Sequence, residues 1–257
     1  MGFKPNHRKK FNISNCLNTQ LQEAFEKPIT ISGQFLGIRN IHHGSFNKRT
    51  VIFTSYKNGG AFSLESRLEL AHAVNLERDI SVLKYRTQAL KVILSKAMYA
   101  IPDFLILNNL HNYEVHEVKS NLKSLSKEKI EKLEVTKQVL KSYNIKYKIF
   151  DEIALPSNKE INSILRIYKH VKNINIDKDR INLAKILTED INKNFTFLLD
   201  HLSKYKYSYN EICYLIFYKH IQANIDIWVF IMTDLFITPH FGMKFIYKNS
   251  EYEIVSI

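Results

Sequence analysis

The stretch between residues 103 and 150 constrains the fold of this chain more than any other. A compact apolar run at 103–107 (DFLIL) is followed by an Asn-Asn turn and by 113–119 (YEVHEVK), where apolar and polar residues alternate. Helical spacing follows over 127–143, with Ser126 as a candidate N-cap, and alternation returns at 145–150 (IKYKIF). Strand, helix, strand is the order of a βαβ unit, so the last two strands are expected to be parallel neighbours in one sheet.

Further strands and one helix are predicted upstream of this unit. The segment 50–56 is rich in β-forming residues and ends at Asn-Gly-Gly, a strong turn signal. A helix is expected over 63–78, and short strands are expected at 81–85 and 89–94. Residues 1–50 are polar and are predicted to be irregular. Together with the βαβ unit, these elements predict an α/β domain with a mixed sheet flanked by helices.

The second half of the chain has a different pattern. Leu-Pro-Ser-Asn at 155–158 is typical of a linker, so we predict an N-terminal domain at 1–155 and a C-terminal domain at 156–257. The C-terminal domain is expected to be mainly helical and similar to a winged helix, with a terminal hairpin. Its expected helices and strands cover 159–171, 179–192, 195–203, 209–223, 245–247 and 252–255.

Positive charge is concentrated in the first half of the chain. There are 37 Lys and Arg against 25 Asp and Glu, which gives a net charge of +12. Residues 151–257 hold 13 of each sign, so the first 150 residues hold the other 24 basic and 12 acidic side chains. An AT-rich genome would inflate lysine in both halves, which is not observed. The asymmetry therefore predicts that the N-terminal domain binds a polyanion.

Composition excludes several other classes of protein. With 45% hydrophobic residues, 7 Gly and 5 Pro, the chain is expected to fold rather than to be disordered or collagen-like. Cys16 and Cys213 are too few for a disulfide scaffold, and we expect free thiols. The basic N-terminus lacks the apolar core of a signal peptide, and charges interrupt the apolar stretch 212–232, which favours a core helix. We therefore expect a soluble, cytoplasmic protein with no membrane partner.

Three charged residues of the N-terminal domain form a pattern with a chemical meaning. Asp103 follows Pro102 at the start of one predicted strand, and Glu117 and Lys119 lie two apart on the next. Period-two geometry places Glu117 and Lys119 on one face, and a hairpin would bring Asp103 beside them. Two carboxylates suit Mg²⁺, and a lysine can orient water or stabilise charge at phosphorus. Pro-Asp…Glu-x-Lys is the sequence pattern of metal-dependent nucleases. An ordinary strand with an exposed Glu–Lys pair would show the same pattern.

Glu69, on the helix expected before these strands, has two alternative roles. In nucleases of this kind a preceding helix often supplies a further carboxylate. Ser66 also fits a capping box, in which Glu69 only caps the start of the helix. These residues alone leave both roles open.

Residues 48–152 resemble the TnsA endonuclease family, whose members are subunits of heteromeric transposases. The matching motifs, in the family's order, are Ser-Arg-Leu-Glu-Leu-Ala at 66–71, Leu-Glu at 76–77, Val-Leu-Lys-Tyr-Arg-Thr-Gln at 82–88, Asp-Phe-Leu at 103–105 and Glu-Val-Lys at 117–119. Two departures leave the subfamily open: Ser120 stands where a proline is common, and Ala89 stands where a bulky apolar residue or proline is usual.

The resemblance implies a restriction-endonuclease-like fold for the N-terminal domain and an active site. The implied catalytic residues are Glu69, Asp103, Glu117 and Lys119. The implied ligands of two Mg²⁺ or Mn²⁺ ions are Glu69, Asp103, Glu117 and the carbonyl oxygen of Val118. Such a protein cuts the 5′ strands at transposon ends in double-stranded DNA, while an integrase-type transposase cuts and joins the 3′ strands. The resemblance also implies a nucleoid-associated bacterial protein whose C-terminal domain docks an AAA+ regulator ATPase.

Alternative functions and weaker site candidates remain. The same residues fit a stand-alone restriction or repair nuclease, or a DNA-binding subunit that lost catalysis. A purely structural protein is disfavoured by the basic asymmetry.

Gln88 either braces the active site or contacts DNA, or is an exposed strand end. His116 and Glu114 are expected on the face opposite Glu117, with His116 structural. The candidate phosphate contacts are Lys9, Lys10, Lys48, Arg49 and Lys57.

Overall fold

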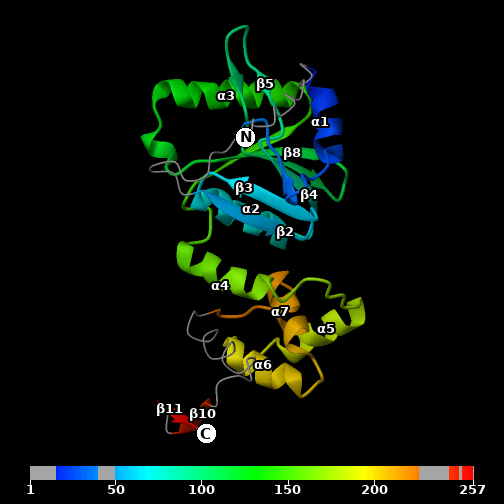
Figure 1. Cartoon of the computed structure of the whole chain (residues 1–257), viewed down its shortest axis with the longest axis vertical. Helices are drawn as coiled ribbons and strands as arrows, with labels where there is room; N and C mark the ends of the chain where they lie inside the picture. Colours follow the sequence, from blue (N-terminus) through cyan, green and yellow to red (C-terminus); the bar gives the residue numbers. More distant parts are fainter. Residues whose placement is uncertain (1–15, 40–49, 226–242, 249–250, 257) are drawn as a thin grey trace, which may run out of the picture. The chain divides into compact units, whose positions relative to one another are not determined.

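The chain forms two compact units, Met1–Asn158 and Lys159–Ile257 (Figure 1). The division lies close to the predicted domain boundary at residue 155. The computed structural model describes residues 16–39, 50–225, 243–248 and 251–256. The predicted phosphate contacts at Lys9, Lys10, Lys48 and Arg49 lie outside the described residues, as does the apolar segment 227–232.

A four-stranded mixed sheet forms the centre of the first unit. Its strands, in spatial order, are β4 (Val82–Thr87), β7 (Phe104–Asn108), β8 (Tyr113–Val118) and β9 (Lys146–Phe150). β4, β7 and β8 are antiparallel neighbours, whereas β8 and β9 are parallel. Helix α3 (Lys127–Ser142) joins the parallel pair and begins where the Ser126 side chain accepts the Lys129 N–H. This confirms the predicted βαβ unit.

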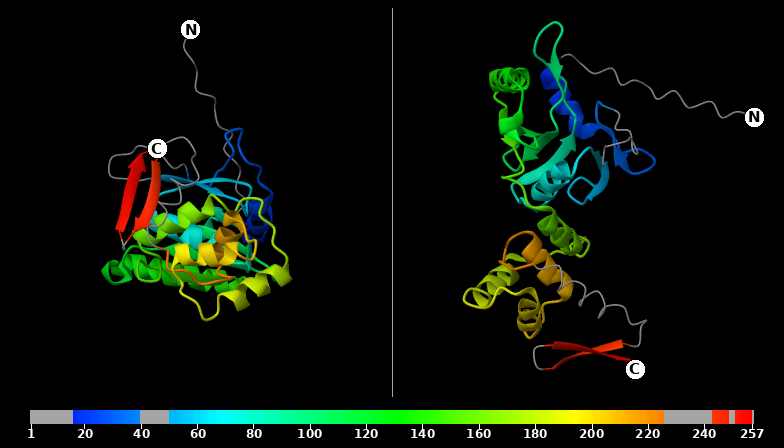
Figure 2. Two further views of the ribbon diagram at one scale, coloured as in Figure 1. Left: turned by 90° about the horizontal axis from the view of Figure 1, so that it is seen from below. Right: turned by 90° about the vertical axis from the view of Figure 1, so that its left-hand side faces the viewer.

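Helices cover both faces of the sheet (Figures 1 and 2). α1 (Leu17–Glu26) and α3 bury their apolar residues against the face that carries Val115. α2 (Arg67–Arg78) covers the opposite face, where the ring of His72 lies 5.0 Å from the ring of Phe104. The first unit therefore has an α/β architecture, with a mixed sheet between helical layers.

Shorter strands complete the first unit. A three-stranded sheet has the order β1 (Gln34–Phe35), β3 (Gly60–Leu64), β2 (Val51–Ser55), and β5 (Val92–Ile93) pairs with β6 (Tyr99–Ala100) in a two-stranded ribbon. A single 3₁₀ turn, η1 (Leu122–Ser124), precedes α3. Phe62 of β3 is fully buried, and its ring lies 5.3 Å from that of Tyr85, which joins the small sheet to the central one.

The start of helix α2 differs from the prediction. The sequence predicted a helix from residue 63, but Leu64 is buried as the last residue of β3. Ser66 then adopts an extended conformation, and its side chain accepts the N–H of Glu69 as the N-cap of α2. The alternation of buried residues in β3 overrides the helical spacing at this point.

Two further predictions in the first unit were wrong. Residues 1–50 were expected to be irregular, yet α1 forms because its apolar face is buried against the sheet. Gln20 also donates to and accepts from the backbone of Lys91, at 3.1 and 2.7 Å. The strand predicted over 89–94 is limited to β5. Gln88 has a φ of 47°, which ends β4 and turns the chain before β5 begins.

The second unit is mainly helical among its described residues. Its elements are α4 (Asn158–Tyr168), α5 (Lys178–Leu187), α6 (Phe195–Ser203), α7 (Tyr209–Phe217), and an antiparallel hairpin of β10 (Met243–Lys248) and β11 (Glu251–Ser256). α6 has its predicted bounds, whereas α4, α5 and α7 end earlier than predicted. Lys219 has a φ of 59°, so α7 ends within the apolar stretch 212–232, whose residues after 225 lie outside the described part of the chain. The similarity to a winged helix stays a prediction.

Candidate active site

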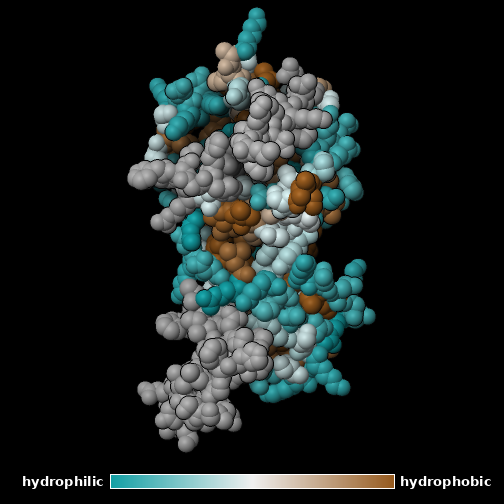
Figure 3. All heavy atoms as spheres, in the orientation of Figure 1, coloured by the Kyte–Doolittle hydropathy of each residue, from teal (hydrophilic) through white to brown (hydrophobic). Residues whose placement is uncertain are grey.

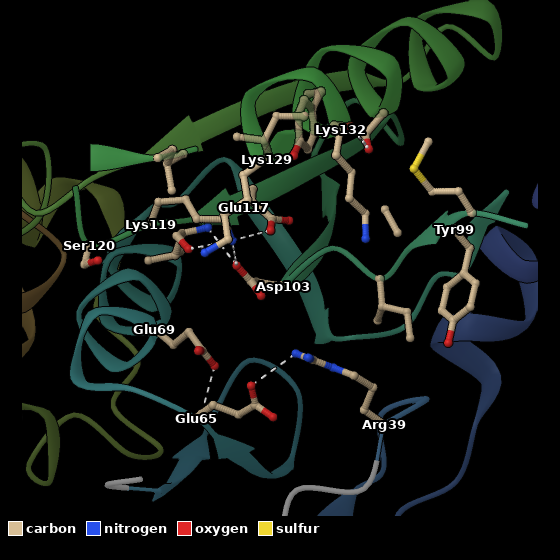
Figure 4. A pocket seen from close by; sticks show the side chains of 18 of the residues that line it. Arg39, Glu65, Glu69, Tyr99, Asp103, Glu117, Lys119, Ser120, Lys129 and Lys132 are labelled. Carbon is tan, nitrogen blue, oxygen red and sulfur yellow. Dashed lines mark hydrogen bonds and ion pairs between the residues drawn. The ribbon is translucent and has the colours of Figure 1, made fainter. Parts of the chain in front are cut away.

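An open cleft of about 810 Å³ lies where β7 begins and β8 ends (Figure 4). Because these strands are antiparallel, the start of one and the end of the other meet at the same edge of the sheet. The five residues predicted to form the site all line this cleft: Glu69, Asp103, Glu117, Val118 and Lys119. The structure thus brings them together from α2, β7 and β8.

Asp103, Glu117 and Lys119 form a hydrogen-bonded cluster. One Asp103 carboxylate oxygen accepts the N–H of Val118 at 2.8 Å and lies 3.9 Å from the Lys119 ammonium. The same ammonium pairs with Glu117 Oε1 and donates to the Val118 carbonyl oxygen at 3.2 Å. Glu117 and Lys119 therefore share a face of the chain, as the alternation predicted, and Asp103 lies beside them.

Glu69 approaches the cluster from the start of α2 (Figure 4). Its carboxylate accepts the Glu65 N–H at 2.9 Å and the Ser66 hydroxyl at 3.1 Å, while its own N–H donates to the Ser66 oxygen at 3.1 Å. Glu69 thus makes capping contacts and also lines the cleft. The two roles that the sequence left open are compatible in one conformation.

Burial of the carboxylates changes their acidity. Burial, followed by the neighbouring Asp103 charge, raises the pKa of Glu69 to about 7. The same two causes raise the pKa of Glu117 to about 7, although Lys119 opposes the change. Burial also raises the pKa of Asp103. For Lys119, burial disfavours the charge, but Glu117 and Asp103 outweigh it and the pKa is raised. The cleft therefore holds partly neutral carboxylates beside a firmly protonated lysine.

A divalent cation fits the chemistry of this oxygen cluster. Carboxylates that repel one another in a buried site gain most from a cation, and Mg²⁺ commonly takes one or two carboxylates together with waters and phosphate oxygens. The carboxylates of Asp103 and Glu117 and the Val118 carbonyl oxygen all lie within 4 Å of the Lys119 ammonium, so these oxygen ligands are close together. In the described parts of the chain, no three His, Cys, Asp or Glu side chains are grouped so that they could hold a metal ion by themselves.

Sequence reasoning missed several residues of the cleft. Arg39 and Glu65 form an ion pair of 3.2 Å at its edge, and neither position carries a local signal. Tyr147 of β9 has a pKa raised by burial and then by the Glu117 and Asp103 charges. Tyr147 pairs with Val115, which lies two residues from Glu117 and therefore on the same face of the sheet. The alternation in β9 is the sequence signal that could have placed Tyr147 on this face. Further residues of the cleft come from α3 and from the β5–β6 ribbon.

Two weaker candidates have structural roles. His116 lies on the opposite face of the sheet, where its Nδ1 is 3.0 Å from His72 Nε2 and its Nε2 is 3.3 Å from Glu114, as predicted. Lys57 was a candidate phosphate contact, but its ammonium donates to the carbonyl oxygens of Leu76, Asp79 and Val82. Burial lowers the pKa of Lys57 to about 8. It caps the end of α2, which argues against a role in binding phosphate.

Gln88 supports the cleft through hydrogen bonds of its backbone. It is 2% exposed, so the alternative of an exposed strand end is wrong. Its N–H donates to the Asp103 carbonyl oxygen at 2.9 Å, and its own carbonyl accepts the N–H of Ile38 at 2.9 Å. The side-chain amide has no hydrogen-bond partner among the described residues.

Comparison of the chain with models of known protein families gives no match, and neither does comparison with curated proteins. Within the described residues, no helix has the length and apolar character needed to cross a membrane.

Proposed function

We propose that this chain is a metal-dependent DNA endonuclease. The observation that carries the proposal is the meeting of Asp103, Glu117 and Lys119 in one open cleft, with Glu69 nearby. Paired carboxylates next to a charged lysine suit hydrolysis of a phosphodiester, whose transition state is an anion. The excess of basic residues in the first 150 residues supports a polyanionic substrate.

In the proposed reaction, water attacks phosphorus and the bond to the 3′ oxygen breaks. The products are a 5′-phosphate and a 3′-hydroxyl. Lys119, held by Glu117 and Asp103, is oriented to bind the attacking water or the phosphoryl oxygens as their charge develops. Its raised pKa keeps it cationic at neutral pH, which favours charge stabilisation over proton abstraction.

Mg²⁺ or Mn²⁺, as two ions, would be held by Asp103, Glu117, the Val118 carbonyl and Glu69. When bound, such ions supply Lewis-acid stabilisation of the phosphoryl oxygens and lower the pKa of bound water. The buried carboxylates favour this arrangement, because a cation offsets both the burial of their charges and the repulsion from Asp103, the two causes that raise the pKa values of Glu69 and Glu117.

The particular role that we propose follows from the resemblance to TnsA. In this role the first unit has a restriction-endonuclease-like fold and cuts the 5′ strands at transposon ends, as one subunit of a heteromeric transposase. An integrase-type transposase is its partner, and the second unit docks an AAA+ regulator ATPase. The order of the matching motifs in residues 48–152 supports the role of the first unit, whereas that of the second rests on analogy.

Strand cleavage with matched variants tests the proposal. DNA carrying the ends of the element that encodes the chain is incubated with the chain, an integrase-type transposase of the same element and Mg²⁺ or Mn²⁺. We expect 5′-strand nicks with the wild type, and their loss with Asp103→Ala and with Lys119→Ala. Glu114→Gln is the matched control, because Glu114 lies on the same strand but bonds His116 on the opposite face.

Each other outcome has a defined meaning. If wild type and all variants behave alike while binding DNA, the chain is a non-catalytic DNA-binding subunit and the proposal fails. Cleavage of DNA without element ends or transposase, still dependent on Asp103, would instead identify a stand-alone nuclease of the same chemistry.

A further inference from the structure

One face of helix α3 carries two lysines that line the cleft. The α3 residues that line it are Lys129, Lys132, Leu133 and Thr136, which are spaced as one stripe of a helix. α3 also carries Glu128, Glu131 and Glu134, yet none of these lines the cleft. Figure 4 shows Lys129 and Lys132 on α3, across the cleft from Glu69. Of the charged residues of α3, only lysines line the cleft.

These two lysines are not neutralised by the protein. Lys129 and Lys132 are exposed, and neither forms an ion pair with another described residue. Lys119 differs, because Glu117 and Asp103 already neutralise it. Figure 3 shows hydrophilic residues at the upper left, where part of α3 is visible, and the exposure of both lysines means that water and salt reach them. The two free ammonium groups therefore remain available for anions that enter the cleft.

The β5–β6 ribbon continues the same wall. α3 packs against β5, and Met98 and Tyr99 line the cleft beside the helix. Met98 is 38% exposed and Tyr99 is 48% exposed, while the Lys91 ammonium lies 4.5 Å from the centre of the Tyr99 ring. An exposed aromatic ring next to a cation is the kind of surface on which sugars and bases pack in nucleic-acid complexes.

We propose that this surface, the strand wall formed by Met98, Tyr99, Lys129 and Lys132, holds the backbone of the DNA strand that is cut. The inference rests on the proposed function and adds the residues that position its substrate. Glu69, Asp103 and Glu117 repel a phosphodiester, so the strand needs cations on the facing wall to approach them. Lys129 and Lys132 bind phosphates next to the scissile one, and Tyr99 packs against a sugar or base.

The salt dependence of DNA binding tests the lysines without any cleavage. Affinity of the full chain for a 30-bp duplex is measured by fluorescence anisotropy with EDTA, over a series of KCl concentrations. Loss of two phosphate contacts in Lys129→Ala/Lys132→Ala should reduce the slope of log K against log salt by about 1.8, since each contact contributes about 0.9. The affinity near 0.1 M salt should fall by roughly tenfold or more.

Two further variants separate charge in the cleft from charge in general. Lys137→Ala/Lys141→Ala removes two exposed lysines of the same helix that do not line the cleft, and should leave the slope unchanged. Tyr99→Ala should weaken binding severalfold with no change in slope, because its contact involves no counterion, and Tyr99→Phe should restore the affinity.

The inference is overturned if Lys129→Ala/Lys132→Ala keeps the wild-type slope, or if the control pair loses as much. Unchanged affinity in Tyr99→Ala would remove the ribbon from the wall. Failure of this inference can be distinguished from failure of the proposed function. Nicks that depend on Asp103, together with unchanged slopes, would leave a nuclease that holds DNA elsewhere. Changed slopes without nicks would leave a DNA-binding wall on an inactive protein.

Discussion

Replacement of Glu69 by glutamine should stabilise the metal-free protein at alkaline pH. A buried carboxylate next to Asp103 is costly when charged, which is why its pKa lies at about 7 instead of near 4.5. A carboxyl that titrates near pH 7 in the fold and near 4.5 in the unfolded chain removes up to about 3 kcal/mol of stability between these pH values. Between these pH values the folded protein binds more protons than the unfolded chain, so the free energy of unfolding falls as pH rises.

Glutamine keeps most of the local contacts of Glu69. Its carbonyl oxygen can still accept from the Glu65 N–H or the Ser66 hydroxyl, but a neutral acceptor is weaker by about 1 kcal/mol. We therefore expect Glu69→Gln to be about 1–2 kcal/mol more stable than wild type at pH 8, with a much smaller difference at pH 5. The opposite expectation holds if Glu69 only caps α2, because loss of a capping charge destabilises the helix at both pH values.

Urea unfolding of the full chain in EDTA at pH 5 and pH 8 measures this effect. Hydrogen exchange at α2 and β8 reports on the first unit alone, which matters because two units need not unfold together. Glu65→Gln serves as a control: Glu65 lines the same cleft but is paired with Arg39, and its charge is only the last of the causes that raise the pKa of Glu69, so its loss should give a much smaller gain. A Glu69→Gln protein that is no more stable at pH 8 than at pH 5, relative to wild type, would show that the charge of Glu69 does not destabilise the fold.

The remaining predictions concern stability and metal binding. Glu77→Ala should destabilise the first unit by about 3 kcal/mol in chemical denaturation, because the buried carboxylate accepts from the Tyr85 hydroxyl and two other donors. Hydrogen bonds from Arg180, and then from Ser208, lower the pKa of Glu211 to about 2, so the second unit should lose about 1 kcal/mol as pH falls from 4.5 to 2, and Arg180→Ala should weaken this dependence in acid titrations followed by circular dichroism. Millimolar Mg²⁺ should raise the melting temperature of wild type, measured by calorimetry, but not that of Asp103→Asn.

Local periodicity was sufficient to predict the centre of the site. Alternation in 113–119 placed Glu117 and Lys119 on one face, because the strand period is a property of the backbone alone. The Asn-Asn turn predicted the hairpin that brings Asp103 beside them. The start of α2 was wrong because strand alternation and helical spacing overlap near residue 64.

Residues placed by tertiary packing could not be predicted. The side of α3 that faces the cleft depends on how the helix lies on the sheet, so Lys129 and Lys132 carried no signal apart from the general excess of charge. The capping of α2 by Lys57 likewise depends on contacts across 19 to 25 positions of the chain. α1 was missed because its stability comes from burial against the sheet, not from a strong local pattern.

The capping contacts of Glu69 strengthen the case for the site. A glutamate that caps a helix needs only water on its other side, and most such residues lie at the surface. Here the same contacts hold the carboxylate in a buried position near Asp103, where the two charges repel. Among the described residues, only Lys119 lies within ion-pair distance of the Asp103 and Glu117 carboxylates. Stability alone would favour a neutral side chain at position 69, and the cation that we propose for the cleft would offset both the burial and the repulsion of this charge.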